Sequence, residues 1–192
     1  PGDRLVSARY DELMRTAEAA FAADDFEGAA ELYGQAVELA RQCDDRDGAD
    51  RAFCSQCAVL IELDRGADQI PKLKEILLSS GNDRNRFHAA YCTAVAYDLS
   101  GDTEKATSYA DRASAMATGL GDPISASRSF NLLGNLSIRA SEFAAAERAF
   151  AESLDAHNGL DGHHRVPEVQ VRDNRGYVMM CTDRLEAGIE LC

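Results

Sequence analysis

A short turn flanked by two small residues, twelve positions apart, recurs along this chain and constrains its fold more than any other feature. Three copies keep this spacing and a fourth is one residue shorter; the flanking pairs are Ala17 and Ala29, Ala94 and Ala106, Gly134 and Ala146, and Gly176 and Ala187. Two helices can cross closely only where each contributes almost no side chain. Such a unit, repeated at roughly 40 residues, predicts a stack of helical hairpins.

The segments between the turns favour helix. They run for about 13 to 19 residues and are rich in Ala, Leu, Glu and Arg. Sustained period-two alternation of β-branched residues is missing, so we expect no strands. We therefore predict an all-α fold of about five hairpins in a single domain, residues 1–192. The hairpins are expected at about 5–43, 49–80, 84–119, 123–157 and 166–192.

The second hairpin is the least regular of the five. It lacks the pair of small residues, and Pro71 falls near the start of its second helix. We place its two helices at about 49–64 and 68–80, and we assign Asp47 and Gly48 to the connection that precedes them. Its repeat length is also shorter than that of its neighbours, so the register of its residues cannot be matched to theirs.

The second helices share an apolar stripe. Phe26, Ala29, Tyr33 and Ala36 follow the first turn, and Phe143, Ala146, Phe150 and Ser153 repeat the pattern at the same offsets. Residues spaced i, i+3, i+7 and i+10 lie on one side of a helix. Together with the small–turn–small unit, this stripe resembles the tetratricopeptide repeat over about residues 10–192, in its long variant of about 40 residues. The resemblance implies a right-handed α-α superhelix whose first helices line a concave groove.

The resemblance also implies which positions would face that groove. Carried over to this sequence, they are Asp11, Met14, Glu18 and Phe21; His88, Tyr91, Val95 and Asp98; Arg128, Asn131, Asn135 and Arg139; and Asp173 and Tyr177. The residues we predict to bind a peptide or protein are Arg128, Asn131, Asn135, Arg139, Tyr91, His88, Asp98 and Tyr177.

Asn131 and Asn135 are one helical turn apart, so their carboxamides should point the same way. Each carboxamide can donate to and accept from an extended peptide backbone, whatever the peptide's sequence. Arg128 and Arg139 flank the pair and could hold carboxylates. Exposed Asn and Arg also occur on helices simply because they are well solvated, and that interpretation remains open here.

The charge of the chain argues against two classes of partner. The formal net charge is −13, and residues 1–50 carry 13 acidic side chains against five Arg and no Lys, a net −8. Binding to nucleic acid or to an anionic membrane depends on Lys and Arg. We therefore predict neither partner, although a cationic partner at the N-terminal end is permitted. No stretch approaches 18 consecutive apolar residues, so we expect no membrane span.

Three groups of residues could suggest a metal or redox site. Cys54 and Cys57 form a C-x-x-C, with His88 and Cys92 one hairpin later, but two Cys three apart on a regular helix rarely converge on one metal. A connection holds His157, Asp161, His163 and His164, residues that usually serve as exposed polar filler there. The segment from Cys43 to Gly48 begins like a calcium loop but has Cys in place of its first carboxylate. We predict no metal, no cofactor and no catalytic residues.

The predicted function is therefore that of a non-catalytic scaffold that binds a protein or peptide partner in its groove. Six Cys at mostly apolar helical positions favour a reducing, cytoplasmic location. An alternative is a ligand- or peptide-sensing regulatory domain of a larger bacterial signalling or transcription-regulatory protein, since we expect the natural chain to continue past one end or both. A third is homodimer formation through the unfinished last repeat, whose apolar surface a second copy would bury.

Overall fold

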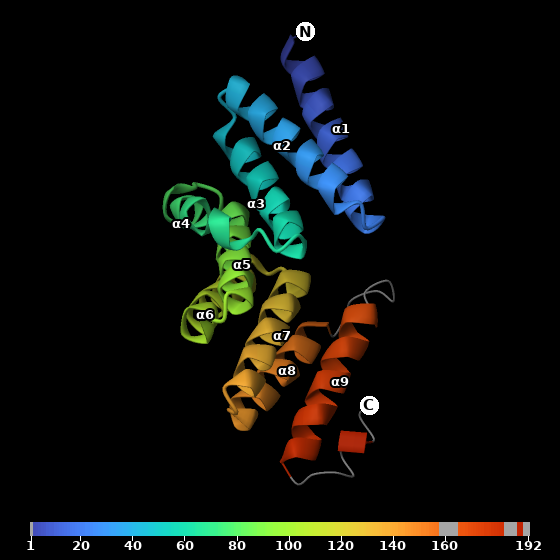
Figure 1. Ribbon diagram of the computed structural model, residues 1–192, viewed down its shortest axis with the longest axis vertical. Helices are drawn as coiled ribbons and strands as arrows, with labels where there is room; N and C mark the ends of the chain where they lie inside the picture. The colour runs from blue at the N-terminus through green and yellow to red at the C-terminus, as the bar shows by residue number, and fades with distance from the viewer. Residues whose placement is uncertain (1, 158–164, 183–187, 190–192) are drawn as a thin grey trace. The chain divides into compact units, whose positions relative to one another are not determined.

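The computed structural model describes residues 2–157, 165–182 and 188–189, and every regular element within these ranges is helical (Figure 1). The helices are α1 Gly2–Ala22, α2 Phe26–Gln42, α3 Arg46–Glu62, α4 Ile70–Ser79, α5 Asp83–Leu99, α6 Thr103–Leu120, α7 Pro123–Arg139, α8 Phe143–His157 and α9 Arg165–Cys181, with a 3-10 turn, η1, at Ala67–Gln69. The predicted all-α class is confirmed. Most of the second helix predicted for the fifth hairpin lies outside the described residues.

Backbone contacts divide the chain into two compact units, residues 1–100 and residues 101–192. The first unit holds α1 to α5, and the second holds α6 to α9. Each unit is described by itself below. A single domain spanning 1–192 therefore stays a prediction.

Short polar side chains cap the starts of α2, α3, α5, α6 and α7. Asp25, Asp45, Asp102 and Asp122 each accept a hydrogen bond from the backbone N–H three residues on, and Asn82 accepts from two N–H groups at the start of α5. These bonds satisfy amide groups that have no partner within the helix. The polar residues at the turns thus fix where each helix begins.

Several turns need a residue in the left-handed region of backbone conformation. Asp24 and Ser141 adopt φ values of 61° and 60° in the turns that precede α2 and α8, and Gly101 adopts 80° before α6. Asp tolerates this region better than most residues, and Gly adopts it without steric cost. Asp and Gly therefore occur at these turns because the backbone there needs a positive φ.

In the first unit, α2 packs between α1 and α3, as Figure 1 shows in blue and teal. Ala17 of α1 and Ala29 of α2 are both fully buried, as the predicted helix crossing requires. Tyr33 and Ala36, from the predicted stripe of α2, are also buried in this core. Met14 is only 3% exposed, so its predicted place on an exposed groove is wrong: it fills the core between α1 and α2 instead.

In the second unit, α7 and α8 pack against each other most extensively, and α8 also packs on α9. Gly134 of α7 lies against the ring of Phe150 of α8, which is fully buried. A Cβ added at Gly134 would lie only 2.6 Å from Cδ1 and Cζ of that ring, so this crossing needs glycine. Val171 and Val178 of α9 complete the cluster around the ring.

The second hairpin departs from the others. Its first helix, α3, begins at Arg46 rather than near residue 49, because Asp45 caps it; Asp47 and Gly48 belong to its first turn, not to a connection. Its second helix, α4, begins at Ile70 after η1 and packs on α5. Among the described residues, α3 and α4 do not pack along each other. Without small residues to allow a close crossing, the two helices stand apart.

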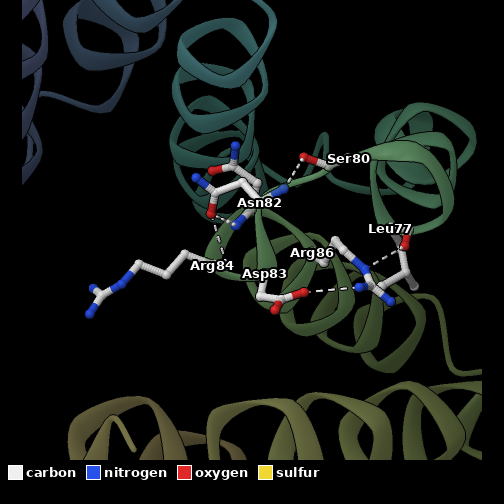
Figure 2. Close-up of polar contacts among 7 residues, drawn as sticks. Leu77, Ser80, Asn82, Asp83, Arg84 and Arg86 are labelled. Atoms are coloured by element: carbon white, nitrogen blue, oxygen red, sulfur yellow. Dashed lines mark hydrogen bonds and ion pairs between the residues drawn. The ribbon is translucent and has the colours of Figure 1, made fainter. Parts of the chain in front are cut away.

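A polar network fixes the connection between α4 and α5 (Figure 2). Asn82 Oδ1 accepts hydrogen bonds from the backbone N–H groups of Arg84 and of the next residue, at 3.0 and 3.3 Å, and its own N–H donates to Ser80 Oγ. The guanidinium of Arg86 reaches back to the carbonyl of Leu77, at the end of α4. These bonds tie the start of α5 to the end of α4. The side chain of Arg84 points away from the network in Figure 2.

Candidate functional site

The candidate site begins with two asparagines on α7. Asn131 and Asn135 are both partly exposed, whereas Leu132 and Leu136, which follow them directly in α7, are buried. Asp122 and Pro123 fix the start of this helix and hence the direction in which each later side chain points.

A third asparagine, on α9, joins the two carboxamides of α7. Nδ2 of Asn174 donates to Oδ1 of Asn131 at 3.3 Å and to Oδ1 of Asn135 at 3.2 Å. We call Asn131, Asn135 and Asn174 the Asn cluster. The expected common direction of the first two carboxamides is observed, and their role in binding stays a prediction. Sequence reasoning missed Asn174; its place one turn before Tyr177 on a predicted groove helix was the available signal.

The Asn cluster has hydrogen-bond donors and an acceptor that its internal hydrogen bonds do not use. A carboxamide offers two N–H donors and one oxygen acceptor. Within the part of the chain that the structure describes, the amide N–H groups of Asn131 and Asn135 and the oxygen of Asn174 make no hydrogen bond. The cluster therefore presents donors and an acceptor side by side, as an extended peptide backbone does.

Three other predicted residues lie on the same two helices. Arg128 and Arg139, on α7, are exposed before and after the asparagines, and both also interact with other residues of the chain. Tyr177, on α9, is 50% exposed and lies one turn beyond Asn174. A hydrogen bond with Cys181, one turn further, raises the pKa of the Tyr177 hydroxyl. The second unit thus collects five of the eight predicted binding residues on α7 and α9.

The remaining three predicted residues belong to α5, in the first unit. His88 is exposed, whereas Tyr91 and Asp98 are partly buried. The ring of Phe87 contacts both His88 and Tyr91, with centroid distances of 5.0 and 6.1 Å. The structure groups these side chains along one helix. A single groove that includes residues of both units stays a prediction.

The buried thiols of the first unit are held by backbone carbonyls. Sγ of Cys54 donates to the carbonyl of Asn85, and Sγ of Cys92 donates to the carbonyl of Cys54, each at 3.8 Å. Burial, with a smaller effect of the neighbouring thiols, raises the pKa of Cys54 and Cys57 far above the usual value. Thiolate is the form that binds metals and attacks disulfides, so this environment suppresses both kinds of chemistry.

Metal-ligating side chains do not gather elsewhere in the described ranges. No group of three or more His, Cys, Asp or Glu placed to hold a metal ion occurs among the residues in 2–157, 165–182 and 188–189 that could be searched. Of the cluster in the connection after α8, Asp161, His163 and His164 and the side chain of His157 lie outside the described residues. In the same searched part of the chain, no helix is long and apolar enough to cross a membrane.

Comparison with solved structures identifies the fold. The crystal structure of BtubC (BKLC) from P. vanneervenii is similar with a TM-score of 0.80 and 17% identity, over 97% of this chain and 78% of that protein. The crystal structure of MamA has a TM-score of 0.59 and 14% identity, over 96% of this chain and 88% of its own. This chain has a tetratricopeptide-repeat-like fold. The resemblance seen in the sequence is confirmed at this level, whereas the 40-residue variant stays a prediction.

A third structure gives the same result. PilW, described as a widely conserved type IV pilus biogenesis factor, has a TM-score of 0.56 and 13% identity, over 95% of this chain and 90% of its own. No protein-family model matches the chain, and a search of curated proteins finds no significant match. At 13–17% identity, these likenesses establish the fold and leave the function to be argued from the residues.

Proposed function

We propose that this protein is a non-catalytic binding scaffold whose second unit holds an extended peptide segment of a partner against the Asn cluster. The observation that carries the proposal is the joint arrangement of Asn131, Asn135 and Asn174 across α7 and α9. Three carboxamides that hold one another in place are already ordered before a ligand arrives. Less conformational entropy is then lost on binding.

The chemistry of the cluster suits a peptide backbone. The amide groups of Asn131 and Asn135 can donate to two backbone carbonyls, and Oδ1 of Asn174 can accept from a backbone N–H. Such contacts do not depend on the peptide's side chains. Sequence preference would come from the residues that flank the cluster.

The flanking residues favour an acidic peptide. Arg128 and Arg139 are exposed at the two sides of the cluster, and a guanidinium can hold a carboxylate through two parallel hydrogen bonds. Tyr177 adds a flat, half-exposed ring that can bury apolar area at low entropic cost. On α5 of the first unit, His88, Tyr91 and Asp98 remain predicted binding residues in their own right.

A peptide array tests this proposal directly. The purified chain is applied to extended 10-residue peptides in acidic, neutral and basic series, and binding to the best acidic peptides is then measured by calorimetry. We expect the double variant Asn131→Ala/Asn135→Ala to bind at least about tenfold more weakly, because two backbone hydrogen bonds of about 1 kcal/mol each are lost. Its melting temperature should stay close to that of the native chain.

The reason for an unchanged melting temperature is a balance of two small effects. The double variant loses its hydrogen bonds to Asn174 but gains about 0.6 kcal/mol of helix propensity at each position. The matched control is Gln35→Ala/Gln42→Ala, which removes two exposed carboxamides from α2. If the Asn double variant binds as tightly as this control, the Asn cluster is not the binding surface.

A further inference from the structure

A cavity of about 240 Å³ lies in the first unit, among α2, α3 and α4. It is present where α3 and α4 lack the close crossing that small residues allow between α1 and α2 and between α7 and α8. The residues that matter to its chemistry are Arg41, Arg46, Asp50, Phe53, Lys72 and Glu75. Pockets for drug-sized ligands usually measure about 300–1,000 Å³. This smaller cavity has room for a single side chain or a small charged molecule.

Asp50 is one of the residues that line this cavity, and its carboxylate has no partner among the described residues. Asp50 is only 7% exposed, and its Oδ2 is completely buried. Neither oxygen makes a hydrogen bond or an ion pair with any residue that the structure describes. A buried charge of this kind destabilises the folded state unless a donor reaches it. The cavity that Asp50 lines is where such a donor would enter.

The cationic side chains of the cavity are engaged elsewhere. Nζ of Lys72 lies 2.9 Å from Oε1 of Glu75, Arg46 donates to Ser79 Oγ at 2.7 Å, and Arg41 pairs at 2.8 Å with a glutamate of its own helix. The hydrogen bond from Lys72, followed by the charges of Lys72, Arg46 and Arg41, lowers the pKa of Glu75. Lys72 is thus paired with Glu75, and none of these three cationic side chains pairs with Asp50.

We propose that this cavity binds a primary ammonium group carried on an alkyl stem, with Asp50 as its counter-ion. An ammonium is compact and offers three donors, as a mostly enclosed carboxylate requires. The ring of Phe53 forms one wall, where it covers the alkyl stem and attracts the cation. The net −8 charge of residues 1–50 favours the approach of a cation.

Two sources can supply this chemistry: the lysine side chain of a partner protein, or a free diamine. Both would place the same group against Asp50. The cavity shares no residue with the Asn cluster and belongs to the other unit. Its binding can therefore be tested independently of the proposed peptide site.

Calorimetric titration of the full chain at low salt provides the test. The probes are 1,5-diaminopentane and the peptide acetyl-Gly-Lys-Gly-amide; 1,5-pentanediol and acetyl-Gly-Leu-Gly-amide serve as uncharged comparators. We expect an amine probe to bind and its comparator not to bind. Asp50→Asn should weaken amine binding by about tenfold or more, because a charge-assisted hydrogen bond is replaced by a neutral one.

A matched control and a folding measurement accompany the titration. Glu62→Gln removes an exposed carboxylate from the end of the same helix and should leave binding unchanged. Asp50→Asn should melt at or above the native temperature, because a buried unpaired charge is removed. Tighter binding of the peptide supports a lysine of a partner, and tighter binding of the diamine supports a free amine. The proposal is overturned if the native chain binds neither amine, or if the folded Asp50→Asn variant binds as tightly as the native chain.

Discussion

The crossing of α7 and α8 offers the sharpest test of how the repeat is held together. We predict that Gly134→Ala destabilises the protein, although alanine is the better helix former. The added methyl would lie 2.6 Å from two ring carbons of Phe150, and that ring is fully buried. Forcing one more carbon into a packed core costs about 1–3 kcal/mol, whereas the gain in helix propensity is about 1 kcal/mol.

The expected net loss is about 1 kcal/mol in the free energy of unfolding, or about 2–4 °C in Tm for a chain of this size. Gly119→Ala is the matched control: Gly119 lies in α6, is exposed, and has nothing within 4 Å of an added Cβ. This control should gain up to about 1 kcal/mol. Thermal and urea unfolding, followed by circular dichroism, measure both changes.

A double variant isolates the contact itself. Phe150→Leu removes the ring that an alanine at position 134 would meet. The combined variant should therefore be less destabilised than the sum of Gly134→Ala and Phe150→Leu. The reasoning is refuted if Gly134→Ala stabilises the protein as much as Gly119→Ala does, because the crossing would then have room for a side chain.

Two further predictions concern buried side chains. Burial, followed by the charge of Glu18, raises the pKa of Tyr33 to about 12, so its neutral form is favoured by folding. The stability this provides is complete below about pH 10, where unfolded tyrosine titrates, and is lost as the pH rises toward 12. Tyr33→Phe should therefore make the free energy of unfolding depend less on pH in this window. A thiol reagent should label exposed Cys43 and Cys181 quickly and buried Cys54 only on unfolding; peptide mapping that finds Cys54 labelled at the rate of Cys43 contradicts this.

Most of the helices could be predicted from the sequence because they begin on a local signal. Asp25, Asp102 and Asp122 cap their helices from positions that read as turns. The predicted end of the third hairpin, 119, and start of the fourth, 123, differ from the end of α6 and the start of α7 by one residue or less. The same local rule also explains the error at α3. Asp45 and Asp47 both read as helix starts, and only the structure shows that Asp45 accepts the capping bond.

The candidate site could be predicted only in part. The spacing of Asn131 and Asn135 on one helix settles their common direction, but Asn174 lies about 40 positions away on α9. Its register depends on how two helices pack, and the sequence leaves that register uncertain by one residue. Whether Asp50 finds a hydrogen-bond partner depends likewise on where α4 lies. The irregular second hairpin gives no sequence pattern from which α4 could be placed.

Some interpretations of the sequence remain predictions. A sensing role within a larger protein depends on chain outside these 192 residues. Self-association through the last repeat would involve residues 183–187 and 190–192, which the structure does not describe. A cytoplasmic location rests on cysteine usage alone. Each concerns how this fold is used, and none alters the two proposed sites.

Side-chain amide resonances give the most direct test of the central proposal, that the Asn cluster binds an extended peptide. The NH₂ signals of Asn131, Asn135 and Asn174 are assigned from single-residue variants and followed by NMR while the best acidic peptide from the array is titrated. The account predicts that these three signals shift together along the same binding curve, with the backbone amides of α7 and α9. Saturable binding that leaves all three signals in place and shifts residues elsewhere would contradict it.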